Sequence, residues 1–186
     1  PISTLFPYTT LFRSNKAIEL ISTLKPNHVS AYSLKIEEGT PLYERYEKGG
    51  VQLPDEALER EMYHTIENKL SELGIHQYEL SNFAVEGAES KHNKVYWKNQ
   101  AYLGLGVSAH SKFNHVRHSN TNQINTYIEA LSKGQLATDE DIYIDAKEDR
   151  FETIMLGLRL NEGISIQDIE TRYVIDFNEK YGAVVK

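Results

Sequence analysis

The sequence has 186 residues, of which 40% are hydrophobic and 25% are charged, and its formal net charge is -7. Such a chain is long enough to bury a hydrophobic core, and it has neither a secretory signal nor an apolar run of about 20 residues, which predicts a cytoplasmic protein without an integral membrane segment. An acidic balance with no block of Lys and Arg argues against a nucleic-acid partner, and the lack of cysteine excludes disulfides, thiolate catalysis and a cysteine-held iron–sulfur cluster within these residues.

The chain begins with residues 1–14, which show neither helical nor alternating periodicity. This stretch resembles translated adapter or vector sequence, and we expect it to be a non-native scar outside the fold. From Ala17 onwards, apolar residues recur at helical spacing until Pro26 prevents continuation, which predicts a helix of about ten residues. Residues 29–36 are apolar on both faces, a pattern typical of a strand in a sheet that helices cover.

The clearest predicted helix begins after Pro54, where Asp55 can cap the first turn, and Gly74 suits the left-handed position that ends a helix. A polar loop with a short helical turn, residues 39–50, precedes it. One apolar stripe of this helix is expected to face the core: Leu58, Met62, Ile66, Leu70 and Leu73. Residues 75–83 are predicted to form the next strand. This alternation of helices and strands predicts an α/β architecture with parallel strands joined by crossovers.

A polar segment, residues 86–94, follows this strand at the end where parallel α/β folds place binding residues. Residues 102–106 form a short apolar run with two glycines, which permit close approach of the backbone. Further on, Asn122 can cap a helix that ends at Gly134. The polar run at residues 138–141 indicates a domain boundary.

The last part of the sequence predicts two helices joined by a tight turn. Asp145 and Glu148 have the spacing of a capping box, and Ser165 and Asp168 repeat it. The face that the first of these helices should bury carries Phe151, Ile154, Met155 and Leu158. A DNA-reading helix-turn-helix is the alternative for residues 164–169, but the acidic surroundings argue against phosphate contact.

The densest constellation of chemistry-bearing side chains is His92-Asn-Lys-Val-Tyr-Trp97. A neutral imidazole is a natural axial ligand of haem iron, and a flat porphyrin gains from aromatic faces such as those of Tyr96 and Trp97. Composition alone favours a plainer interpretation, in which the aromatic side chains anchor a loop on the core and His92 caps a turn.

Two further groups of polar residues are candidate binding or catalytic sites. His110, His115 and His118 allow a His-only metal centre, but a histidine-rich polar loop without a nearby carboxylate is mostly solvated. Glu37 lies at the C-terminal end of the first predicted strand and Glu79 at the matching end of the second, so both can line a ligand rim. Nothing in the sequence, however, fixes an acid/base pair at a defined separation. Neither group identifies an activity.

Six motifs occur in an order that resembles one family. They are Ser30-Ala-Tyr-Ser-Leu34, Glu38-Gly-Thr-Pro-Leu-Tyr43, Tyr78-Glu-Leu-Ser-Asn-Phe-Ala84, Glu89-Ser-Lys-His-Asn93, Val95-Tyr-Trp97 and Tyr102-Leu-Gly-Leu-Gly106. The series resembles the HemW-type haem chaperones, which are radical-SAM relatives of oxygen-independent coproporphyrinogen III oxidase. The resemblance extends from Lys16 to Lys186.

The resemblance implies that the sequence is a C-terminal fragment with an α/β fold. Residues 15–137 would be the C-terminal part of a radical-SAM partial (β/α) barrel with a haem-binding loop, and residues 138–186 the start of a truncated helical domain of the HemN type. In this family the preceding part supplies the cysteine triplet that holds a [4Fe-4S] cluster and most of the site for S-adenosylmethionine (SAM).

The resemblance also implies roles for individual residues. His92 would contact or ligate the haem iron, Asn93 would orient His92, and Tyr96 and Trp97 would face the porphyrin. Leu34 and His110 are carried over more weakly, as contacts of the SAM adenosine. No residue of this chain is assigned a catalytic role.

The function implied is that of a haem chaperone in porphyrin and haem metabolism, with haem and haem-accepting proteins as partners and with SAM and a [4Fe-4S] cluster as cofactors of the full-length protein. The first alternative is an oxygen-independent coproporphyrinogen III oxidase, which decarboxylates propionate side chains. The second is a non-catalytic structural or interaction domain. Without the cluster cysteines this chain alone should lack oxidase activity, and whether it forms a homodimer stays open.

Overall fold

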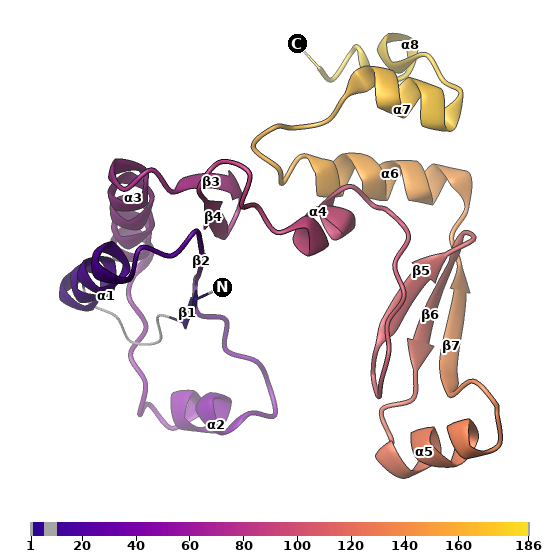
Figure 1. Cartoon of the computed structure of the whole chain (residues 1–186), viewed down its shortest axis with the longest axis horizontal. Helices are drawn as coiled ribbons and strands as arrows, with labels where there is room; N and C mark the ends of the chain where they lie inside the picture. The colour runs from indigo at the N-terminus through magenta and orange to yellow at the C-terminus, as the bar shows by residue number, and fades with distance from the viewer. Residues whose placement is uncertain (1, 6–10, 186) are drawn as a thin grey trace. The chain divides into compact units, whose positions relative to one another are not determined.

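The computed structural model describes residues 2–5 and 11–185, with side chains from residue 15 onwards (Figure 1). The chain divides into two compact units, Pro1–Ser90 and Lys91–Lys186. None of the helices in the described part is long and apolar enough to cross a membrane. The domain boundary that the sequence suggests near residue 138 stays a prediction.

The first unit is a mixed sheet of four strands with helices packed on it. Its elements are β1 (Ile2–Leu5), α1 (Leu11–Leu24), β2 (His28–Tyr32), α2 (Pro41–Glu47), α3 (Glu56–Glu72), β3 (His76–Glu79) and β4 (Asn82–Ala84). The strand order is β1-β2-β4-β3, where β1 and β2 are parallel and β4 is antiparallel to both of its neighbours. Helices α1 and α3 contact each other, and α3 also contacts β3.

Helix α3 follows the sequence pattern closely. The Asp55 carboxylate accepts a hydrogen bond of 2.8 Å from the Leu58 backbone N–H, and Gly74 has a φ of 75° just after the helix. The buried stripe meets the apolar residues of α1 and the sheet in one core: Ile18, Ile21, Val29, Ile66, Leu70, Ile75 and Phe83. The capping predicted for this helix is confirmed. Of the predicted stripe, Met62, Ile66 and Leu70 are buried, whereas Leu58 is half-buried and Leu73 is 41% exposed.

The single strand predicted at residues 75–83 is wrong, because the structure has a hairpin there. Strands β3 and β4 are antiparallel, with a register shift between Gln77 and Glu79. The buried Glu79 carboxylate accepts hydrogen bonds from the Ser81 backbone N–H and from the Asn82 side chain, which satisfies the polar groups of the turn. Consequently β3 runs in the same direction as β2, as expected for a crossover, but β4 lies between them.

The start of the chain also differs from the prediction. Ile2–Leu5 forms β1, and helix α1 begins at Leu11 rather than near Ala17, so the expected lack of regular structure is wrong for these residues. Residues 1 and 6–10 of the predicted scar lie outside the described residues. Whether residues 1–14 are native to the protein stays a prediction. Strand β2 ends at Tyr32, so residues 33–36 are not part of it.

The second unit combines a three-stranded antiparallel sheet with short helices. Its elements are α4 (Lys91–Trp97), β5 (His110–Phe113), β6 (Val116–Asn120), α5 (Ile124–Ser132), β7 (Thr138–Tyr143), α6 (Ala146–Gly157), α7 (Ile166–Tyr173) and α8 (Phe177–Tyr181). The strand order is β5-β6-β7. Helix α6 contacts α4 and α7, and α7 contacts α8. The polar run at residues 138–141 belongs to β7, whose backbone pairs with β6 while its side chains stay exposed.

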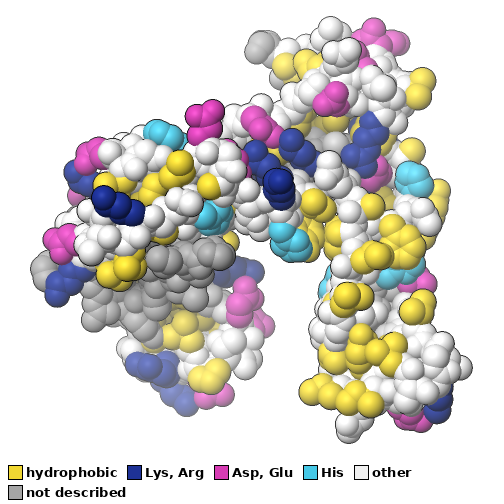
Figure 2. Space-filling view, in the orientation of Figure 1, with side chains coloured by type: hydrophobic (Ala, Val, Ile, Leu, Met, Phe, Trp, Pro, Cys, Tyr) yellow, Lys and Arg dark blue, Asp and Glu magenta, His cyan; other side chains and the backbone are white. Residues whose placement is uncertain are grey.

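Helix α5 differs from the prediction in its cap, and helix α6 differs in the face that it buries. The cap of α5 is Gln123 rather than Asn122, and its apolar side chains lie on the surface, where Figure 2 shows hydrophobic groups over this helix. On α6 the Asp145 cap is confirmed, but Phe151 is 65% exposed. The buried residues of α6 are Asp149, Thr153 and Gly157. The expected apolar face of α6 is therefore wrong, because a buried polar network described below takes the inner side.

The core of the first unit yields a stability prediction. Leu70 has no exposed surface, whereas Leu73, one turn later at the end of the same helix, is 41% exposed. Leu70→Ala should lower the free energy of unfolding by about 2–5 kcal/mol, because it removes buried methyl groups and leaves a cavity. The matched variant Leu73→Ala should cost less than about 1 kcal/mol. Urea unfolding followed by circular dichroism measures both, and equal losses would contradict this core.

Candidate functional site

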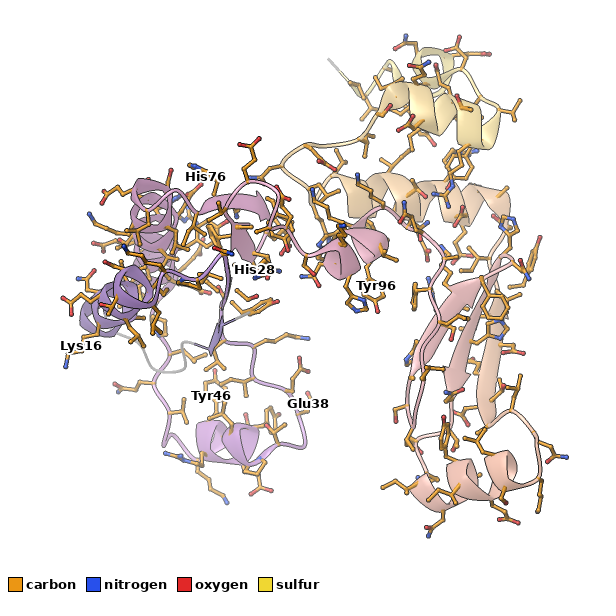
Figure 3. All side chains as sticks on the ribbon, in the orientation of Figure 1. Lys16, His28, Glu38, Tyr46, His76 and Tyr96 are labelled. Atoms are coloured by element: carbon orange, nitrogen blue, oxygen red, sulfur yellow. The ribbon has the colours of Figure 1, made fainter. Side chains whose placement is uncertain are left out.

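Helix α4 carries the histidine–aromatic motif, which is therefore on a helix and not in the loop that the sequence suggested. His92 and Tyr96 are four residues apart, and so lie one above the other on one face of the helix. Their ring centroids are 4.9 Å apart, and the rings meet edge to face at 87°. Both side chains are exposed, and Figure 3 shows Tyr96 projecting from the helix.

A third aromatic side chain extends this pair. The ring of Tyr102 lies 4.7 Å from that of Tyr96, tilted by 67°. We name His92, Tyr96 and Tyr102 the aromatic row. The motif Tyr102-Leu-Gly-Leu-Gly106 includes this tyrosine, but the sequence assigns it no role at the site. No local signal in the sequence identifies it, because the contact joins a helix to a segment beyond the end of that helix.

Trp97 is on a different side of α4 from the aromatic row. It lies about 100° around the helix from Tyr96, since an α-helix has 3.6 residues per turn. The Arg159 guanidinium lies over its indole ring, 5.3 Å from the ring centroid. The indole N–H is buried and has no hydrogen-bond partner among the described residues. The structure thus brings together His92 and Tyr96 of the four predicted residues and places Trp97 apart from them.

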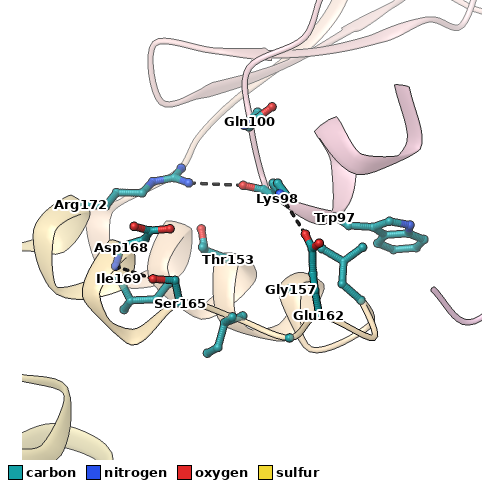
Figure 4. A pocket seen from close by; sticks show the side chains of 13 residues that line it. Trp97, Lys98, Gln100, Thr153, Gly157, Glu162, Ser165, Asp168, Ile169 and Arg172 are labelled. Atoms are coloured by element: carbon teal, nitrogen blue, oxygen red, sulfur yellow. Dashed lines mark hydrogen bonds and ion pairs between the residues drawn. The ribbon is translucent and has the colours of Figure 1, made fainter. Parts of the chain in front are cut away.

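Trp97 lines a cavity of about 400 Å³ that α4, α6 and α7 enclose (Figure 4). Lys98 donates to Glu162 at its rim, with 2.9 Å between Nζ and Oε1. The hydrogen bond from Lys98 and the neighbouring Lys94 charge hold the pKa of Glu162 below its usual value. The rim carries charges of both signs that already neutralise one another, so this cavity is a poorer site for a flat apolar ligand than the aromatic row.

Behind the aromatic row lies a buried polar network around Lys112 of β5. The Lys112 ammonium donates to the Asn99 side-chain oxygen at 2.5 Å, to Asp149 at 2.8 Å and to Glu152 at 3.0 Å. Arg117 donates to the second oxygen of Glu152 at 2.7 Å. Every donor of the ammonium group therefore has an acceptor, which is what makes its burial tolerable.

The second carboxylate oxygen of Asp149 connects α7 to the same network through hydrogen bonds. It accepts hydrogen bonds from Arg172 at 3.0 Å and from the Tyr173 hydroxyl at 2.7 Å. Burial alone would raise the pKa of Asp149, but hydrogen bonds from Lys112 and Tyr173 hold this pKa below its usual value. Burial and the hydrogen bond to Asp149 raise the pKa of Tyr173 to about 12.

The network positions the residues of the aromatic row. Asn99, just beyond α4, donates to Asp149 and to Thr153 of α6 at 3.0 and 2.9 Å. Tyr102 forms a reciprocal pair of backbone hydrogen bonds with Lys112, each 2.9 Å long. The end of α4 and the segment after it are thus both attached to α6 through buried polar groups.

The remaining predicted site residues lie elsewhere. His110, His115 and His118 belong to the β5–β6 hairpin, where the His118 ring stacks on Phe113 and its Nδ1 lies 2.6 Å from an Asp141 oxygen. The described part of the chain contains no group of three or more His, Asp or Glu side chains arranged to hold a metal ion. Leu34 is half-buried just after β2 in the first unit, and His110 is exposed in the second. Their SAM contacts stay a prediction.

Comparisons with known proteins place this geometry in a family context. Residues 144–186 match the model of the HemN C-terminal domain. The chain is 34% identical to the heme chaperone HemW of Bacillus subtilis over 180 residues, which is 97% of this chain and 48% of that protein. It is 32% identical to HemW of Lactococcus lactis over 176 residues, or 95% of this chain and 46% of that protein. The chain spans about half the length of the curated relatives it matches.

Two further relatives widen this comparison. The mitochondrial radical S-adenosyl methionine domain-containing protein 1 of Danio rerio is 33% identical over 165 residues, covering 83% of this chain and 37% of that protein. Among solved structures, coproporphyrinogen III oxidase (HemN) from Escherichia coli, a radical SAM enzyme, is similar with a TM-score of 0.75 and 14% identity, covering 97% of this chain and 45% of that one. This likeness concerns the fold, and it confirms the predicted fold class.

The polar network yields a prediction on stability and its pH dependence. Asp149→Ala leaves the buried Lys112 ammonium and the exposed Arg172 guanidinium each without one acceptor, and should cost about 3–5 kcal/mol of unfolding free energy. Because the folded-state pKa of Asp149 lies below the ordinary 3.8, its contribution is complete above that pH and is lost as the pH falls through the folded-state value. The variant should therefore lose less stability than the wild type in this acid range.

Urea unfolding at a series of pH values below and above 4 tests this. Glu140→Ala is the matched control, because this glutamate lies in β7 of the same unit and its side chain is exposed. The control should change the unfolding free energy by less than about 0.5 kcal/mol. A loss at Asp149 no larger than that of the control would show that the network does not hold this unit together.

Proposed function

The chain belongs to the HemW-type family of radical-SAM proteins related to oxygen-independent coproporphyrinogen III oxidase, and from this premise we propose that it binds haem on α4 and takes part in delivering haem to other proteins. The relatives from Bacillus subtilis and Lactococcus lactis are both named heme chaperone HemW. We propose the same role for the protein that contains this chain, acting in the cytoplasm on haem-accepting proteins.

The observation that carries this proposal is the exposed His92 beside Tyr96. Neither ring nitrogen of His92 has a hydrogen-bond partner among the described residues, so an electron pair is available to iron. The His92 and Tyr96 rings meet edge to face, which limits the orientations that the imidazole adopts. An exposed ligand next to apolar ring surface suits a cargo that must be taken up and released again.

The other two motif residues support the site in different ways. Asn93 follows His92 on the helix, and we propose that its amide orients the imidazole or a group of the ligand. Trp97 provides a broad apolar surface on the neighbouring side of α4, where Arg159 covers it. For Trp97 to face the porphyrin, as proposed from the family resemblance, the ligand must extend around the helix from the aromatic row.

The iron–sulfur cluster of the family does not fit the residues present here. The chain contains no cysteine, so it offers no thiolate for a [4Fe-4S] cluster, and we derive no step through the cluster or SAM. We propose that the protein that contains this chain uses both cofactors. Haem binding at α4 requires neither of them, so it can be tested on this chain.

The test is a titration of this chain with haemin, followed by the Soret band. The wild type should give a saturable, near-stoichiometric spectrum, and His92→Ala should weaken binding at least tenfold, because the variant has no nitrogen at the iron. His64→Ala is the matched control, since His64 is also an exposed histidine on a helix surface, and it should bind as the wild type does. Equal, non-saturating spectra for all three proteins would refute the proposal.

A further inference from the structure

We propose that Tyr102 is a further haem-contacting residue, which rests on the haem site proposed above. The family motif on α4 ends at Trp97, and Tyr102 begins the separate motif Tyr102-Leu-Gly-Leu-Gly106, to which the resemblance gives no haem role. In the structure, however, Tyr102 is the third member of the aromatic row. The geometry extends the ligand surface beyond the helix into the segment that follows it.

Ring contacts are the first evidence. The Tyr96 ring lies between its two neighbours, with centroids 4.9 Å from His92 and 4.7 Å from Tyr102, and both contacts are edge to face. These are favourable aromatic arrangements. A porphyrin bound through His92 and lying against Tyr96 would therefore meet Tyr102 as the next apolar surface along the row.

Rigidity is the second line of evidence. Tyr102 pairs with Lys112 of β5 through two backbone hydrogen bonds, and the Lys112 ammonium is fixed by Asp149 and Glu152. Two residues later, Gly104 lies so close to β5 that a Cβ atom there would be 2.1 Å from the His110 carbonyl oxygen. Tyr102 is thus held by the sheet before any ligand arrives, which reduces the entropy that binding costs.

A purely structural role for Tyr102 makes a different prediction from a ligand contact. If the ring only supports Tyr96, replacing it should lower the stability of the apoprotein and leave the intrinsic affinity of the folded protein for haemin unchanged. If it contacts haem, the affinity should fall even where the apoprotein remains folded. Keeping the ring but removing the hydroxyl should preserve binding in either case.

The experiment titrates haemin into the wild-type chain and into Tyr102→Leu, Tyr102→Phe and His92→Ala. Tyr102→Leu should weaken haemin binding about threefold to tenfold, the range expected for loss of one aromatic contact. Tyr102→Phe should bind within twofold of the wild type. The induced circular dichroism of the Soret band should fall in the leucine variant and be retained in the phenylalanine variant, because it arises from coupling between haem and nearby aromatic rings.

Tyr46→Leu is the matched control, since Tyr46 is a partly exposed tyrosine of α2 in the first unit and should leave binding unchanged. If Tyr102→Leu does not fold, Tyr102→Met replaces it with the same expected results, because a flexible thioether fills irregular gaps. Wild-type affinity and Soret dichroism in the folded leucine or methionine variant, alongside weakened binding in His92→Ala, would overturn the role of Tyr102 alone. An unsaturable wild type, or an unchanged His92→Ala, would overturn the haem site and this inference with it.

Discussion

The buried ion pair between Lys112 and Asp149 is the interaction on which the second unit depends. Both side chains are at most 8% exposed, and the two residues come from a strand and a helix that are 37 positions apart in the sequence. Removing two charges from water is costly, so each needs further hydrogen bonds to offset the loss of solvation. Asn99, Glu152, Arg172 and Tyr173 provide these, and in doing so they connect α4, β5, α6 and α7.

This requirement explains why sequence reasoning succeeded for α3 and failed for α6. In α3 the cap, the apolar stripe and the terminal glycine all indicate the same face, and that face meets the core. In α6 the cap was predictable from Asp145, but the apolar residues indicate the wrong side. A lysine and an aspartate that are distant in the sequence carry no local sign that they will be buried together. Hydrophobic periodicity therefore predicts the wrong buried face of α6, because the buried face is determined by polar partners that only the tertiary structure brings near.

The candidate site shows the same division between local and non-local information. The contact of His92 with Tyr96 follows from a spacing of four residues, and any helix over this motif would produce it. The residue pattern alone did not show that the segment is a helix, and the family resemblance supplied the ligand rather than the geometry. Tyr102 escaped notice because its approach to Tyr96 depends on the backbone pairing with β5.

Helix α4 itself is too short to hold the motif without help. It has seven residues, none of them buried, and isolated helices of this length are unstable in water. What holds its C-terminal end is Asn99, which binds Asp149 and Thr153, together with the pair of Lys98 and Glu162. The exposed histidine is consequently presented by a segment whose conformation is determined by its anchors and not by its own helix propensity. A ligand that bound to the aromatic row would act on the same anchors, so the proposed haem binding would be thermodynamically linked to the stability of the polar network.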